Sequence, residues 1–95
     1  MKKWEEKESP DGTVIHTLTF GHHGNKPEVI AALFRDSDGY WLTTSDLLNT
    51  YWDQLTDKGM CEHDAKMMVE EKVYDCFADE KRYYEEICEE FDMEN

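Results

Sequence analysis

Basic residues are scarce in this 95-residue sequence. Lys and Arg together number 10 against 23 Asp and Glu, which gives a formal net charge of -13. Direct binding to nucleic acid requires basic side chains against the phosphates, and anionic membrane surfaces attract basic segments in the same way. The scarcity of Lys and Arg therefore argues against both, and a basic protein surface is the natural partner.

Cysteines are few, and long apolar runs are missing. The three cysteines, Cys61, Cys76 and Cys88, are odd in number and widely spaced, which argues against a disulfide framework. No apolar run reaches transmembrane length, and the N-terminal MKKWEEKE contains no hydrophobic signal segment. These features predict a cytoplasmic protein in a reducing compartment.

Motifs of catalysis and of metal binding are also missing. The sequence contains no G-x-S-x-G, Walker A or Rossmann glycine pattern. The stretch RDSDGYWLTTSD resembles a calcium loop, but Phe34 and Ser45 occupy the first and twelfth positions, where oxygen ligands are required and the twelfth should be Glu. We therefore expect neither enzyme activity nor a cofactor, and we interpret this stretch as a hairpin turn.

Aromatic residues make up 13% of the chain, including Trp4, Trp41 and Trp52. A disordered acidic chain would have few aromatics, so this composition favours a folded protein. The length suits one small domain with one core. We expect a single domain over residues 1–95, with a mainly β meander over 1–44 and a helical part over 45–93.

Alternating and apolar segments in the first part predict strands. KKWEEKE precedes the turn sequence SPDG, and TVIHTLTF then places Val14, His16, Leu18 and Phe20 on one face. EVIAALF is nearly unbroken in its apolar character, as in a central strand, and YWLTT is a short further strand. Together they predict an antiparallel sheet of three or four strands.

Helical spacing marks the second part. SDLLNTYWDQL is predicted to form a helix that Thr44 or Ser45 caps and that Gly59 ends. From Glu62 a further helical pattern runs almost to the chain end, and we expect it to break near Ala78 and Asp79. The predicted fold class is therefore α+β, a small antiparallel sheet followed by two or three helices. The apolar positions behind the two patterns are Leu47, Leu48, Tyr51 and Leu55, then Ala65, Val69, Val73, Cys76, Tyr83, Ile87 and Phe91.

Acidic residues gather in the C-terminal third. Residues 62–95 carry 13 acids and 4 bases (net -9), whereas residues 1–61 carry 10 acids and 6 bases (net -4), which sum to -13. On a helical wheel the acids separate from the apolar side, and six acids between 85 and 94 give about one charge per 2.3 Å of helix. Duplex DNA carries one charge per about 1.7 Å of axis. The predicted partner-binding residues are Asp64, Glu71, Asp75, Glu85, Glu86, Glu89, Glu90 and Asp92.

The combination of EVIAALFRDSDGYWLTT, two or three following helices and the terminal EEICEEFDMEN resembles the small acidic anti-CRISPR proteins of phages. The resemblance lies in architecture and charge, with no shared residue motif, so no family site residue is carried over. It implies an inhibitor that mimics DNA. Such a protein would occupy the basic groove of an RNA-guided nuclease in the host cytoplasm.

Two other functions fit the sequence. An immunity or antitoxin protein that neutralises a basic toxin would need the same acidic face. A metal-binding regulator could use His22, His23, Cys61 and His63, although their spacing matches none of the usual zinc pairs. A surface whose acidity serves only solubility is the simplest alternative.

Overall fold

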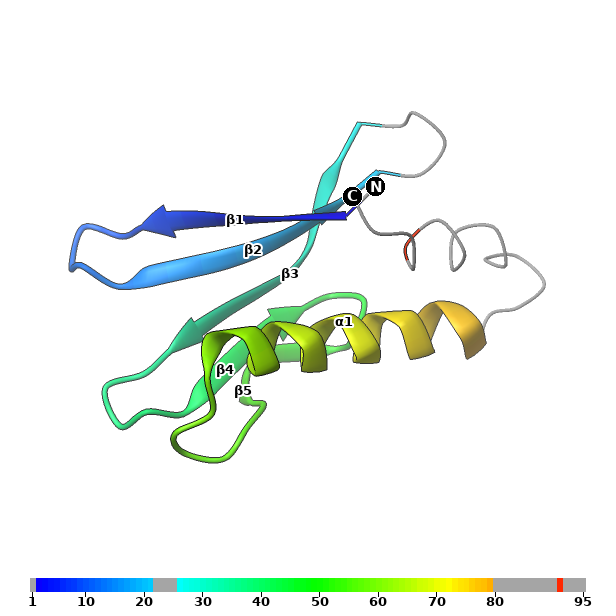
Figure 1. Ribbon diagram of the computed structural model, residues 1–95. Helices are drawn as coiled ribbons and strands as arrows, with labels where there is room; N and C mark the ends of the chain where they lie inside the picture. The colour runs from blue at the N-terminus through cyan, green and yellow to red at the C-terminus, as the bar shows by residue number, and fades with distance from the viewer. Residues whose placement is uncertain (1, 22–25, 80–90, 92–95) are drawn as a thin grey trace.

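The structure is a computed structural model that describes residues 2–21, 26–79 and 91. In these residues five strands form one antiparallel sheet in the order β1-β2-β3-β4-β5, and one helix follows them (Figure 1). Each strand therefore pairs with its neighbours in the chain. The bounds are β1 Lys2–Glu8, β2 Val14–Phe20, β3 Glu28–Arg35, β4 Trp41–Ser45, β5 Thr50–Gln54 and α1 Glu62–Asp79.

Two tight turns set the register of the meander. Between β1 and β2, the backbone N–H of Gly12 donates to the carbonyl of Ser9 at 2.9 Å, and Gly12 has a φ of 89°. Between β3 and β4, the N–H of Gly39 donates to the carbonyl of Asp36 at 3.1 Å, and Gly39 has a φ of 94°. Glycine adopts this left-handed conformation without a steric penalty. β1 to β4 cover the four segments in which the sequence predicted three or four strands.

The predicted helix over SDLLNTYWDQL is wrong, because this stretch forms a turn and the fifth strand. Ser45 does behave like a cap, since its hydroxyl accepts a 3.2 Å hydrogen bond from the backbone N–H of Leu48. The chain then reverses at Asn49, which has a φ of 56°, a left-handed conformation that Asn tolerates better than most residues. Thr50–Gln54 begins with a β-branched residue and two aromatics, TYW, which favour a strand beside β4.

The predicted fold class is corrected accordingly. The sheet has five strands instead of three or four, and the described residues contain the single helix α1 instead of two or three helices. The α1 range begins at Glu62, as expected from the sequence. The further helix expected after Asp79 lies outside the described residues, apart from Phe91.

The core lies between α1 and one face of the sheet. Ala65, Val69 and Val73 are fully buried, at the four-residue spacing that the sequence predicted, and Phe77 continues the row. Cys76, predicted on this face, is only partly buried. The sheet contributes Leu18, Phe20, Ala31, Leu33 and Trp41, and Phe91 completes the cluster.

The opposite face of the sheet carries its own apolar row. Register places Ile15 opposite Phe34 and Phe34 opposite Leu42, and these side chains are partly buried. Trp52 packs edge-on against Phe34 with ring centroids 4.9 Å apart. Trp52 has a φ of 50°, a strained value for a bulky side chain, and it lies where the register of β4 and β5 shifts. The register shift and the positive φ therefore occur at Trp52, the residue whose ring packs on Phe34.

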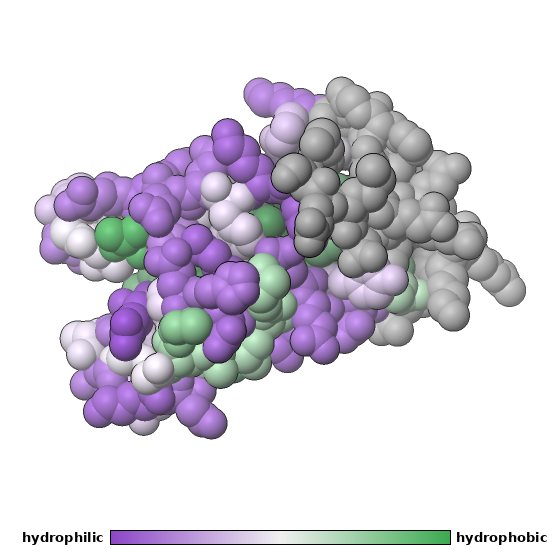
Figure 2. Space-filling model, viewed as in Figure 1, coloured by the Kyte–Doolittle hydropathy of each residue, from purple (hydrophilic) through white to green (hydrophobic). Residues whose placement is uncertain are grey.

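No helix in the described part of the chain is both long enough and apolar enough to cross a membrane. Seen from the side shown in Figure 2, hydrophilic residues cover most of the described surface, and apolar residues form small patches. This distribution matches the low mean hydropathy of -0.85.

Candidate functional site

The acidic side of α1 is the first candidate site. Asp64, Glu71 and Asp75 recur at i, i+7 and i+11, so at about 100° per residue they lie within a narrow sector of the helix. All three are exposed, on the side directed away from the buried Ala65, Val69 and Val73. We call these three carboxylates the acidic stripe. The sequence predicted that these three residues line up along the helix, and the structure shows that they are exposed.

The carboxylates of the acidic stripe have no cationic partner within the described residues. The ion pairs found there involve other acids: Glu70 with Lys2, and Glu62 with Lys66. Glu71 and Asp75 lie four residues apart, where like charges repel. Among the residues that the structure describes, the stripe is thus a negative surface without ion-pair partners.

The other predicted partner-binding residues, Glu85, Glu86, Glu89, Glu90 and Asp92, lie outside the described residues. The same holds for His22 and His23 of the metal-binding alternative. Its other two residues, Cys61 and His63, are exposed where α1 begins. Within the described ranges, neither belongs to a group of three or more ligand-type side chains.

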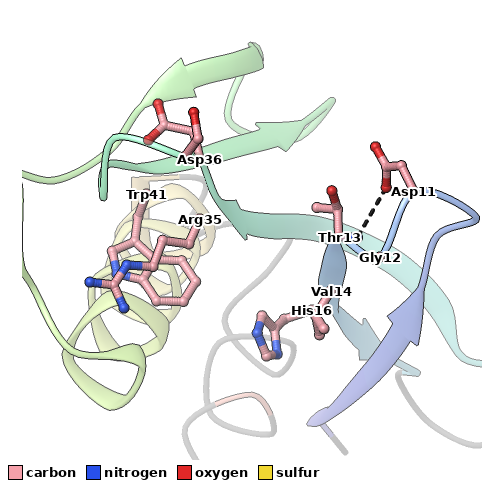
Figure 3. A pocket seen from close by; sticks show the side chains of 9 residues that line it. Asp11, Gly12, Thr13, Val14, His16, Arg35, Asp36 and Trp41 are labelled. Carbon is pink, nitrogen blue, oxygen red and sulfur yellow. Dashed lines mark hydrogen bonds between the residues drawn. The ribbon is translucent and has the colours of Figure 1, made fainter.

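A second candidate site lies between the β1–β2 and β3–β4 turns (Figure 3). It is an open pocket of about 380 Å³ lined by His16 and Val14 of β2, Arg35 of β3 and Trp41 of β4. The Arg35 guanidinium lies 5.9 Å from the centroid of the Trp41 ring, within cation–π range. The pocket thus combines one cation, one aromatic ring and one buried imidazole, and Asp11 and Asp36 add two carboxylates to its lining.

His16 is the unusual group in this pocket. It is buried, and its Nδ1 has no hydrogen-bond partner among the described residues. Burial lowers the pKa of His16 below its ordinary value, and the nearby charge of Lys66 acts in the same direction. Glu62 and Glu6 act in the opposite direction with smaller effects. The imidazole is therefore neutral near pH 7.

Two carboxylates flank the His16 ring. A Glu6 oxygen lies 3.7 Å from Nδ1 and a Glu62 oxygen lies 3.5 Å from Nε2, and both distances are too long for good hydrogen bonds. A hydrogen bond from Lys66 at 3.0 Å lowers the pKa of Glu62. The alternating pattern placed His16 on one face of its strand with Leu18 and Phe20, and it gave no sign of this cluster. The one available signal was the SPDG hairpin, whose register sets Glu6 opposite His16.

Comparisons of the chain with protein-family models, with curated proteins and with solved structures find no match.

Proposed function

We propose that this chain is an acidic inhibitor that binds the basic, nucleic-acid-binding surface of a nuclease or another nucleic-acid-handling protein. In its most specific form the proposal is a phage anti-CRISPR protein that acts by nucleic-acid mimicry in the host cytoplasm, with a binding role rather than an enzymatic one. The observation that carries it is the acidic stripe. Asp64, Glu71 and Asp75 are exposed on one side of α1 and belong to none of the ion pairs among described residues.

Charge spacing defines what the stripe can imitate. Asp64 and Asp75 are 11 residues apart, or about 16 Å along the helix. One DNA strand presents about five phosphates over that length, whereas the stripe presents three carboxylates. Carboxylates accept paired hydrogen bonds from Arg, as phosphates do. To match the charge of one DNA strand, the protein therefore needs further carboxylates, and the six acids in residues 85–94 can supply them.

An exposed aromatic residue offers a further contact for a basic partner. Tyr51 lies on the edge strand β5 and is 81% exposed. The sequence analysis treated Tyr51 as part of a helix, and its place on an edge strand leaves its ring accessible. An Arg side chain can stack on such a ring.

The same surface suits a basic toxin, so an immunity or antitoxin function is the alternative. The two targets differ in their nucleic-acid substrate and in gene context. A gene for a basic nuclease beside this one favours the antitoxin, whereas inhibition of an RNA-guided nuclease favours the anti-CRISPR. The metal-binding regulator built on His22, His23, Cys61 and His63 has no such supporting observation in the described residues.

Affinity capture from lysate of the native host tests the proposal. The bait is the full chain at low salt, compared with the triple variant D64N/E71Q/D75N and with E86Q/E89Q/E90Q. A matched control, E5Q/E8Q/E28Q, removes three exposed acids elsewhere and changes the net charge equally. We expect the parent chain and the control to capture a nucleic-acid-handling protein that elutes at moderate salt. The two variants of the acidic surface should capture less of it. Equal capture by all four baits would contradict the acidic surface proposed here.

A further inference from the structure

Three ligand-type side chains from three separate elements converge beside the sheet. Glu6 comes from β1, His16 lies directly opposite it on β2, and Glu62 is the first residue of α1. One donor atom from each residue lies within 4.8 Å of the donor atoms of the other two. This cluster is separate from the acidic stripe.

The imidazole forms the buried floor of the cluster. The His16 side chain is 5% exposed, whereas those of Glu6 and Glu62 are 63% and 49% exposed. A buried polar atom normally has a hydrogen-bond partner, yet His16 Nδ1 has none among the described residues. A ligand that accepts the imidazole lone pair would satisfy this nitrogen, and the two carboxylates supply the matching negative charge.

We propose that Glu6, His16 and Glu62 form a binding site for a divalent transition-metal ion, with Zn²⁺ as the best fit. Imidazole and carboxylate together suit zinc, whereas Mg²⁺ and Ca²⁺ prefer all-oxygen sites. Tetrahedral zinc with bonds of about 2.0–2.2 Å places neighbouring donors about 3.4 Å apart. The Glu6 contact of 3.7 Å is made to Nδ1 and the Glu62 contact of 3.5 Å to Nε2, so each is close to this spacing, but at a different nitrogen of the ring.

Binding requires a modest rearrangement. The two carboxylates face different ring nitrogens, so one of them must swing toward the nitrogen that binds the metal, and their exposure leaves them free to do so. Lys66 competes, because its Nζ lies 3.0 Å from the second oxygen of Glu62. Three protein ligands leave the fourth position of zinc to water.

The experiment uses the full chain with H22Q, H23Q, H63Q and C61S, which removes the ligand types of the other candidate metal site. His16 is then the only histidine, because the chain has four. Zn²⁺ is titrated by calorimetry, and imidazole ¹⁵N shifts are recorded by NMR. We expect one saturable equivalent and a large shift of one His16 nitrogen.

Variants at the exposed ligands test the geometry without disturbing the buried ring. E6Q and E62Q should each weaken Zn²⁺ binding by at least about tenfold, the lower range seen when even a supporting residue of a metal site is lost. E5Q, next to Glu6 but on the other face of β1, should bind like the parent, and K66Q should bind more tightly. Unmoved His16 signals, or equal affinity of E5Q, E6Q and E62Q, would overturn the proposal.

Thermal unfolding of the otherwise unaltered chain supplies a second readout. A ligand that binds only the folded protein raises Tm. Excess Zn²⁺ should therefore raise Tm more in E5Q than in E62Q. An identical rise in both variants would place the bound zinc elsewhere and refute the site.

Discussion

Glu70 on α1 accepts a hydrogen bond of 2.8 Å from the indole Nε1 of Trp4 on β1. Its other carboxylate oxygen lies 2.7 Å from the Nζ of Lys2. One partly buried acid thus fastens the helix to the edge strand through two contacts, 66 and 68 positions apart in the sequence. Its neighbour Glu71 points to solvent. Of these two adjacent acids, Glu70 therefore joins the helix to the sheet, whereas Glu71 is part of the exposed acidic stripe.

Loss of Glu70 should destabilise the fold. E70A leaves the Trp4 indole and the Lys2 ammonium without their acceptor, and an unsatisfied buried partner costs about 1–3 kcal/mol. Urea unfolding of E70A should show that loss, while the matched variant E71A should stay within about 0.5 kcal/mol of the parent. Equal stability of E70A and E71A would contradict the structural role of Glu70.

The turn before β5 gives a test of the corrected fold. Asn49 has a φ of 56°, so N49G should preserve stability, whereas N49A should lose about 1–2 kcal/mol because Ala is strained there. A helix across residues 45–55 would give the opposite order, since Ala is the better helix former by about 1 kcal/mol. Denaturant unfolding of the two variants decides between them.

The first turn carries a pH-dependent contribution to stability. Hydrogen bonds from Ser9 and Thr13 lower the pKa of Asp11 to about 2 from an ordinary 3.8. Because the folded state holds the lower pKa, the contribution is fully present above about pH 4 and is lost as pH falls toward 2. NMR titration of the Asp11 carboxyl should give the low midpoint. The D11N chain should lack this part of the acid dependence of Tm, and a midpoint near 4 would contradict the turn geometry.

Neutralising the acidic stripe should not unfold the protein. D64N/E71Q/D75N removes exposed charges without partners among described residues, including the like-charged pair Glu71 and Asp75 at i, i+4, which costs a few tenths of a kcal/mol. Urea unfolding should show unchanged or slightly higher stability. A clear loss of stability would mean that the stripe serves the fold, and reduced binding by this variant would then say little about function.

The local patterns predicted part of this fold. Alternation, turn chemistry and the apolar run EVIAALF indicated the segments of the first four strands, and the spacing of Ala65, Val69 and Val73 indicated the buried side of α1. The stretch 45–55 was misassigned because Leu47, Leu48, Tyr51 and Leu55 repeat at helical spacing. Pairing with β4 overrides that spacing, and Tyr51 turns out to be exposed.

The two candidate sites also differ in how far the sequence could predict them. The acidic stripe lies within one helix, so its geometry follows from helical spacing alone. The cluster at His16 joins β1, β2 and α1, and the position of Glu62 depends on how the helix packs on the sheet. No local pattern encodes that packing, which is why the cluster emerged only from the structure.

Competition with DNA tests the central claim most directly. The captured nucleic-acid-handling protein is mixed with fluorescently labelled nucleic acid of its own substrate type, and anisotropy is followed as the chain is added at two salt concentrations. The account predicts that the parent chain displaces the nucleic acid, less well at high salt, and that D64N/E71Q/D75N does so less than E5Q/E8Q/E28Q. Binding of the chain that leaves the nucleic acid in place would contradict mimicry.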